Sequence, residues 1–125
     1  MIQTLSQVAL GGALGASARY LTNVGVLRLL RPGFPWATII VNVVGSFLMG
    51  VLVIALAKLF GNRFAPLLMT GLLGGFTTFS AFSLDAVTLW ESGRPELAAA
   101  YVGGSVLLSI TALVAGLFIA RGVFA

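Results

Sequence analysis

The chain lacks cysteine and histidine altogether, and it contains few charged residues. Without cysteine, the protein has no disulfide bond and no thiolate metal site. The lack of histidine removes the commonest general base and the commonest metal ligand in proteins. These absences argue against an intramembrane metalloenzyme or a serine hydrolase, and we expect a protein that is not an enzyme.

Charge is scarce throughout the 125 residues: 8% are charged and 59% are hydrophobic, and the mean hydropathy is +1.11. A soluble domain carries about 25% charged residues. The seven Lys and Arg and three Asp and Glu are too few to cover a globular surface in water, but enough to mark two rims of a bilayer. Because the basic residues form no run, the net charge of +4 predicts no nucleic-acid partner. The lipid bilayer is the predicted environment, in the cell (inner or plasma) membrane.

Short polar segments divide the chain into four apolar stretches. A transmembrane helix needs about 20 predominantly apolar residues, and each stretch is long enough. We therefore predict an all-α membrane protein with a single transmembrane domain over residues 1–125. Its four helices are expected at residues 3–27, 36–59, 64–90 and 96–121. The connections are so short that neighbouring helices must run antiparallel, which brings both termini to the same side.

The segment Ala16-Ser17-Ala18 follows an apolar stretch and resembles a signal-peptidase site. Residues 1–7 contain no Lys or Arg, however, so the basic segment of a signal peptide is missing. We expect the N-terminus to be retained as the first helix.

Small residues recur at a spacing of four in all four stretches. The pairs are Gly11 and Gly15, Ser46 and Gly50, Gly71 and Gly75, and Ala112 and Gly116. This spacing lets helix backbones approach closely within a membrane. The frequency of glycine in membrane helices accounts for any one pair, whereas four pairs favour tight packing.

The basic residues give no clear membrane orientation. One side is expected to carry Lys58, Arg63 and Arg121, and the other Arg28, Arg31 and Arg94. Because the positive-inside rule needs an imbalance, two interpretations stand about even. Either a small bias such as the N-terminal amine or Arg19 decides, or the chain inserts both ways and forms an antiparallel dual-topology homodimer. A homodimer is also expected because four short helices leave little room for a water-filled path.

The third stretch contains the strongest local signal, the segment Gly74-Gly75-Phe76-Thr77-Thr78-Phe79-Ser80-Ala81-Phe82-Ser83. Glycine lowers helix stability, and Thr and Ser hydroxyls compete for backbone hydrogen bonds. This cluster favours a helix broken near mid-membrane over a continuous helix whose hydroxyls bond to their own carbonyls. Broken backbone at that depth lines a cavity or is buried in protein, and its freed groups can bind ions.

Two aromatic residues and one amide stand out beside this segment. Phe79 and Phe82 are three residues apart, so both can face one side of the resumed helix. Their positive ring edges can attract an anion, although most membrane Phe residues face lipid or core. Asn42 lies inside the second stretch, where we favour a hydrogen bond between helices over a role as donor to an anion.

The remaining polar residues lie in the fourth stretch and near the helix ends. Tyr101, Ser105 and Ser109 recur every four residues and predict a hydroxyl stripe that faces polar partners or water. Arg19 lies deep in the first stretch, where it faces a cavity or partner or reaches to the nearer interface. Asp85 ends the uncharged part of the third stretch, where it can lie at the membrane rim or in a vestibule.

These motifs resemble the small dual-topology fluoride channels, the Fluc or CrcB family of fluoride exporters, over the whole chain. The most specific match is the segment 74–83, which is similar to the family signature GGxTTFSxFS. Supporting matches are Gly15-Ala16-Ser17-Ala18-Arg19, Thr38 through Val41-Asn42, and the stripe on the fourth helix. Two departures are Asp85, where the family usually has Glu, and Leu113, where relatives continue the stripe with Thr.

The resemblance implies a fluoride-selective ion channel that exports cytoplasmic fluoride passively, built as an antiparallel homodimer with two pores. It implies that Phe79 and Phe82 line the fluoride path. Hydrogen-bonding groups along that path would come from Asn42, Thr78, Ser80, Ser83, Tyr101, Ser105 and Ser109, with Arg19 and Asp85 at the vestibule. It also implies a structural sodium ion at the dimer centre, bound by the backbone carbonyls of Gly74 and Thr77.

Two other classes of protein also have four transmembrane helices or a similar size. A small multidrug transporter also has four helices, but it couples to protons through an acidic residue in its first helix. This chain has no Asp or Glu before Asp85. A structural or assembly subunit without transport would leave the hydroxyl stripe and the predicted break unexplained.

Overall fold

The computed structural model describes residues 1–30 and 33–124 of the chain. Arg31, one of the basic residues in the orientation argument, lies outside this part. The elements are α1 (Ile2–Leu29), α2 (Trp36–Phe60), the π-helical η1 (Pro66–Leu73), α3 (Gly74–Phe76), α4 (Ser80–Glu91) and α5 (Pro95–Val123). The described residues form no strand, which confirms the all-α fold.

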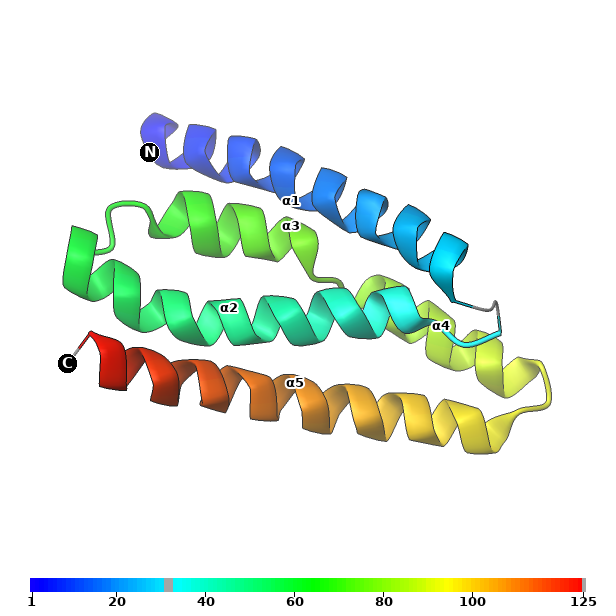
Figure 1. Cartoon of the computed structure of the whole chain (residues 1–125). Coiled ribbons are helices and arrows are strands. Elements are labelled where there is room, and N and C mark those ends of the chain that lie inside the picture. Colours follow the sequence, from blue (N-terminus) through cyan, green and yellow to red (C-terminus); the bar gives the residue numbers. More distant parts are fainter. Residues whose placement is uncertain (31–32, 125) are drawn as a thin grey trace.

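The four predicted stretches run alternately up and down, and the two termini lie at the same end (Figure 1). The elements η1, α3 and α4 together form the third stretch. Within the described residues, three helices are long and apolar enough to cross a membrane, namely Trp36–Phe60, Pro66–Glu91 and Pro95–Val123. The first helix, α1, has 28 residues and a length of about 42 Å, but polar residues such as Gln7, Arg19 and Asn23 interrupt its apolar sequence. The chain is a multi-pass membrane protein.

The predicted helix break is confirmed in the third span. The helix stops after Phe76, and Thr77 adopts an extended conformation with φ −88° and ψ 159°. A new helix, α4, begins at Ser80. The third span therefore consists of two half-helices joined by a short extended segment, visible between α3 and α4 in Figure 1.

Glycines bring α1 into backbone contact with the first half-helix. Gly11 and Gly15 are the buried residues of α1. A Cβ atom on Gly15 would lie within 3.0 Å of backbone atoms of the first half-helix, and one on Gly75 would lie 2.7 Å from the carbonyl oxygen of Gly12. The predicted close packing is confirmed for this helix pair.

A second glycine contact joins α2 to α5, which run side by side in the same direction (Figure 1). A Cβ atom on Gly50 would lie 2.9 Å from the backbone nitrogen of Leu117, and one on Gly116 would lie 3.1 Å from that of Val51. Of the predicted small-residue pairs in these helices, Gly50 and Gly116 make the closest contact, whereas Ser46 borders a cavity.

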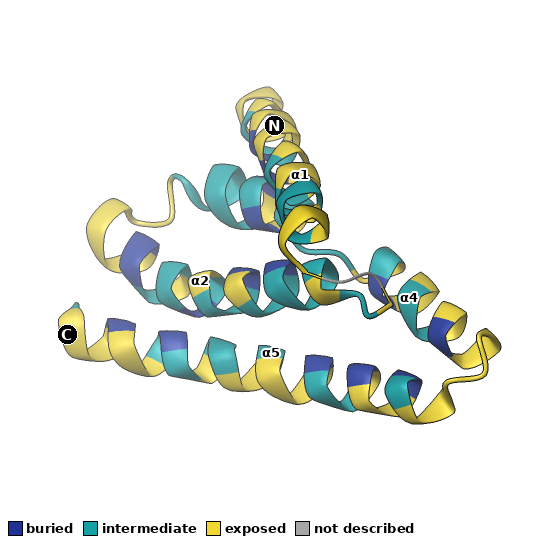
Figure 2. Cartoon of the chain, turned by 45° about the vertical axis from the view of Figure 1, so that its right-hand side comes forward, coloured by how far each residue is buried: buried dark blue, intermediate teal, exposed yellow. Residues whose placement is uncertain are grey.

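Buried residues lie mainly where helices face each other, and the outward faces are exposed (Figure 2). Many exposed residues are large and apolar, such as Leu107 and Phe118, as expected for surfaces that meet lipid. A small apolar core lies between α4 and α5, made by Phe82, Leu89, Ala98 and Tyr101. This core fixes the second half-helix against α5.

The contact of α1 with the first half-helix yields a stability prediction. We expect Gly15→Ala to lower the free energy of unfolding by about 1–3 kcal/mol, because backbone atoms have to move to admit the methyl group. Gly25→Ala, in the same helix, is the matched control, since a Cβ atom there meets nothing within 4 Å. The control should be neutral or stabilising by up to about 1 kcal/mol. Thermal unfolding in detergent measures both, and equal stability of the two variants would contradict the packing argument.

Candidate functional site

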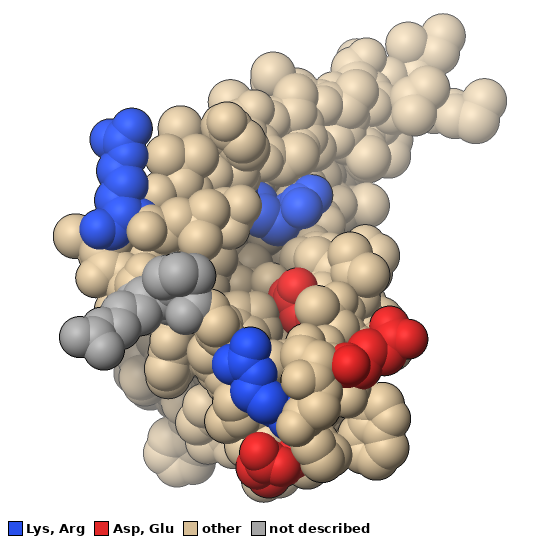
Figure 3. All heavy atoms as spheres, turned by 90° about the vertical axis from the view of Figure 1, so that its right-hand side faces the viewer, with Lys and Arg blue, Asp and Glu red and all other residues tan. Residues whose placement is uncertain are grey.

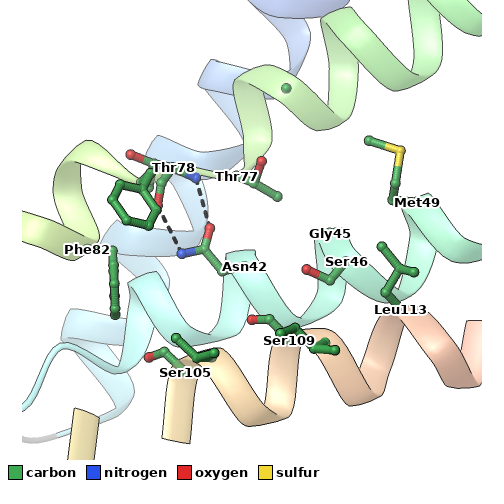
Figure 4. Close-up of a pocket in the computed structure, with 14 residues that line it drawn as sticks. Asn42, Gly45, Ser46, Met49, Thr77, Thr78, Phe82, Ser105, Ser109 and Leu113 are labelled. Carbon is green, nitrogen blue, oxygen red and sulfur yellow. Dashed lines mark hydrogen bonds between the residues drawn. The ribbon is translucent and has the colours of Figure 1, made fainter. Parts of the chain in front are cut away.

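The side chain of Asn42, on α2, holds the helix break in place. Its Nδ2 donates to the carbonyl oxygen of Thr78 at 2.9 Å, and its Oδ1 accepts from the backbone N–H of Thr78 at 2.8 Å. Figure 4 shows this pair of bonds between the extended segment and α2. Asn42 therefore links α2 to the third span, which is the interpretation that we favour from the sequence. An asparagine amide carries two donor hydrogens, so one of them is left over from this pairing.

Other side chains satisfy the backbone on both sides of the break. Arg19 Nε donates to the carbonyl oxygen of Gly75 at 3.0 Å, near the end of the first half-helix. The Thr78 hydroxyl accepts from the N–H of Ala81 at 3.1 Å in the first turn of α4. Arg19 thus binds the backbone of the third span, which favours a side chain that faces a protein partner over one that reaches to the nearer interface.

The same bonds free two carbonyl groups of the break. In a continuous helix, the N–H of Thr78 would bind the carbonyl of Gly74, and that of Ala81 would bind the carbonyl of Thr77. Here the N–H of Thr78 donates to Asn42, and that of Ala81 donates to a hydroxyl. The two carbonyls that the family resemblance implies as sodium ligands have therefore lost their helical donors.

A cavity of about 530 Å³ lies next to the break, between the third span, α2 and α5 (Figure 4). Its polar lining is Asn42, Ser46, Thr77, Thr78, Ser105 and Ser109. Ser105 is only 5% exposed. Its hydroxyl oxygen is buried and has no hydrogen-bond partner in the described part of the chain. A buried hydroxyl without a partner is costly, so Ser105 is suited to bind a group that enters the cavity.

Two phenylalanines border the same cavity, as their spacing predicts. The ring centroids of Phe79 and Phe82 are 5.4 Å apart, with the rings tilted by 58°. Phe82 is buried, with 8% exposure, whereas Phe79 is 77% exposed. One ring is thus fixed in the core, and the other lies on the open surface of the single chain.

The hydroxyl stripe of α5 divides into two parts. Ser105 and Ser109 line the cavity. Tyr101 is fully buried, and its hydroxyl donates to Asp85 Oδ2 at 3.0 Å. The hydroxyl of Thr38 donates to the same oxygen at 2.7 Å. The Asp85 carboxylate is therefore held by two hydroxyl groups from α2 and α5.

A second cavity, of about 240 Å³, contains Arg19 and Asp85 together with Tyr20, Asn23, Thr38 and Thr78. Figure 3 looks onto this end of the molecule and shows a hollow with basic and acidic residues at its sides. Asp85 thus borders an open hollow together with Arg19, as a vestibule residue would. Thr78 borders both cavities, so its pairing with Asn42 lies where the two cavities meet.

Three of the residues that the resemblance assigns to the fluoride path lie outside both cavities: Tyr101, which is buried with its hydroxyl on Asp85, and Ser80 and Ser83. Ser80 and Ser83 are exposed and do not belong to either lining. The Ser83 hydroxyl donates to the carbonyl oxygen of Phe79 at 3.0 Å, within its own helix. Ser80 lies 3.2 Å from the hydroxyl of Thr78. In the single chain, the Ser83 hydroxyl thus binds the local backbone, and the Ser80 hydroxyl contacts the Thr78 side chain.

Thr38 is a partner of Asp85 that the sequence motifs did not predict. A signal was present, because Thr38, Asn42 and Ser46 recur every four residues on α2. They form a second polar stripe, and all three contribute to the walls of the two cavities.

The chain is similar to known proteins along almost its whole length. The model of the family described as "CrcB-like protein, Camphor Resistance (CrcB)" matches residues 6–117. A protein of Cereibacter sphaeroides named fluoride-specific ion channel FluC is 72% identical over 122 residues, which are 98% of each chain. Relatives with the same name are 55% identical in Paracoccus denitrificans, over all of each chain, and 56% in a Ruegeria species, over 98% of each.

The fold and the site define a small multi-pass membrane protein with a polar cavity at a broken helix. The chain belongs to the CrcB family, as its segment 74–83 predicts.

The Asn42 pairing yields a prediction. Asn42→Ala leaves a backbone donor and acceptor of Thr78 unpaired, so we expect the free energy of unfolding to fall by about 2–5 kcal/mol for the two groups. Asn23→Ala, at an exposed amide on α1, is the control and should change stability by less than about 0.5 kcal/mol. Unfolding in detergent measures stability, and faster hydrogen exchange at the Thr78 amide would locate the effect. Unchanged exchange at Thr78 would show that Asn42 does not hold the break.

Proposed function

We propose that this chain is the subunit of a fluoride-selective ion channel, through which cytoplasmic fluoride leaves the cell passively. The observation that carries the proposal is the buried, unpartnered hydroxyl of Ser105 in the cavity at the break. The names of the relatives supply the ion. The absence of Asp and Glu before Asp85 disfavours a proton-coupled multidrug transporter.

The proposed path begins at the vestibule and continues through the larger cavity. Arg19 supplies the positive charge at the entrance, opposite the carboxylate of Asp85. A desolvated anion needs hydrogen-bond donors to replace its water. Donors are available from the unused amide hydrogen of Asn42 and from the hydroxyls of Ser105 and Ser109.

The aromatic rings complete the proposed coordination. Phe82 is fixed between Phe79 and Tyr101, with a centroid distance of 5.2 Å to the tyrosine ring. A fixed ring can present its positive edge to an anion without carrying a full charge. Thr78 contributes a hydroxyl where the two cavities meet. Ser80 contacts that hydroxyl, and Ser83 binds the carbonyl oxygen of Phe79.

An antiparallel, dual-topology homodimer is part of the proposal. Three apolar residues of the cavity wall are also exposed to the outside of the single chain. Phe79 is 77% exposed, Val106 is 43% exposed and Ile110 is 60% exposed. A second copy would cover these residues and close the cavity. The equal number of basic residues expected on the two sides of the membrane, three on each, supports insertion in both orientations.

We also propose that a structural sodium ion lies at the centre of this dimer. The residues fit a hard cation, which prefers oxygen ligands, because the carbonyls of Gly74 and Thr77 have lost their helical donors. Gly74 is exposed in the single chain, so its carbonyl can meet the same group of a second copy. The ion would join the two subunits at their broken helices.

The transport proposal predicts that the purified protein in liposomes releases fluoride, and chloride poorly, when a potassium ionophore balances charge. Phe82→Ile should reduce fluoride release by about 2- to 10-fold, since the ring edge is lost while apolar bulk is kept. Phe118→Ile, at a residue that is 78% exposed on α5, is the matched control and should not change the rate. A fluoride electrode follows the efflux.

Two results would contradict these assignments. Failure of the unaltered protein to release fluoride would reject the transport function. Equal fluoride release from the Phe82→Ile and Phe118→Ile variants would reject the role of the Phe82 ring alone.

The dimer and its sodium ion predict a dependence on the cation. In detergent with sodium chloride, light scattering should give the mass of two chains. Replacing sodium by N-methylglucamine should lower the stability of the dimer by about 2.7 kcal/mol, if the sodium concentration is 100 times the dissociation constant. Potassium at equal concentration is the second control. The mass of one chain in sodium would reject the dimer, and equal stability in all three salts would reject the ion.

A further inference from the structure

The polar lining of the larger cavity stops part of the way along it. Ser105 and Ser109 lie one turn apart on α5, and the next position of the same stripe is Leu113, which also lines the cavity. Figure 4 shows Leu113 and Met49 together at the end of the cavity that lies away from Phe82. Neither a leucine nor a methionine side chain can donate a hydrogen bond.

This apolar end lies deep in the membrane. The backbone of Leu113 packs against Gly50, so Met49 and Leu113 lie at the same level of α2 and α5. From Met49, α2 continues for 11 residues to Phe60, a distance of about 16 Å. Residues 47–57 and 112–120 are all apolar, so neither helix offers a side-chain donor further along these segments.

The third span, which forms the remaining wall of the cavity, does not supply the missing hydrogen-bond donor. Thr77 also lines the cavity, but its hydroxyl donates to the carbonyl oxygen of Leu73 at 2.8 Å. An anion that moves on from Ser109 therefore loses a donor before it has reached water. Moving a charge into such surroundings without replacement hydrogen bonds is costly.

We propose that Leu113, with Met49 opposite, forms an apolar constriction that limits the rate of anion passage, and that the missing hydroxyl at position 113 is the cause. The inference rests on the proposed fluoride transport. In this proposal, Leu113 determines the rate because its side chain has no hydrogen-bond donor for the passing anion.

The test compares Leu113→Thr with Leu113→Val in the fluoride efflux assay. Threonine and valine have nearly the same size and shape, so the ratio of their rates isolates the hydroxyl. One added hydrogen bond to the anion at the constriction should raise the rate of the threonine variant about 2- to 10-fold over that of the valine variant. Leu107→Thr, on the exposed side of α5 with 69% exposure, controls for threonine in this helix and should match the unaltered protein.

The outcomes separate this inference from the transport function. If the unaltered protein releases fluoride but the Leu113→Thr and Leu113→Val variants release it equally fast, the missing hydroxyl does not limit the rate and the inference is wrong. If the unaltered protein releases no fluoride, the transport function itself fails. Met49→Thr adds a hydroxyl from the opposite wall and should also raise the rate. If Leu113→Thr does not fold, an unchanged rate in Met49→Thr overturns the inference.

Discussion

The pairing of Asn42 with the backbone of Thr78 is the interaction on which the rest of the site depends. In a bilayer, backbone polar groups must be satisfied by protein, because lipid offers no partners. A helix broken at Thr77 would expose an N–H and a C=O to that environment, and one amide side chain satisfies both. Without this pairing, the extended segment would lose its anchor on α2. The cavity beside it would then lose the wall that separates it from the vestibule.

The glycine contacts decide where this pairing can form. Gly11 and Gly15 let α1 approach the first half-helix at backbone distance, which brings Arg19 within reach of the carbonyl of Gly75. Gly50 and Gly116 do the same for α2 and α5, so that the polar stripes of these helices border one cavity. Dispersion between closely packed backbones replaces the hydrophobic drive that is missing in lipid. The site is thus positioned by residues that have no side chains.

The four spans and the helix break were predictable from the sequence, because a membrane allows few kinds of structure to cross it. The need for about 20 apolar residues per span fixes the helices, and the cluster of Gly, Thr and Ser in residues 74–83 predicts the break. What the residues could not give was pairing between elements. The partner of Asn42 is a backbone group, which has no signature in the sequence. The bond from Thr38 to Asp85 joins residues 47 positions apart, and Ser80 and Ser83 differ from Ser105 only in the direction that each side chain takes.

The break also has a consequence for how such a site can change during evolution. Asn42 and Arg19 both bind main-chain atoms, and the two freed carbonyls belong to the main chain as well. A codon change at Thr78 replaces its side chain but leaves its N–H and C=O groups in place. A change at Asn42 or Arg19 instead removes the side chain that binds such groups, so the side chain is the half of each contact that a single mutation can remove. The main-chain half is kept as long as the residues that set the path of the chain, such as Gly75, are kept.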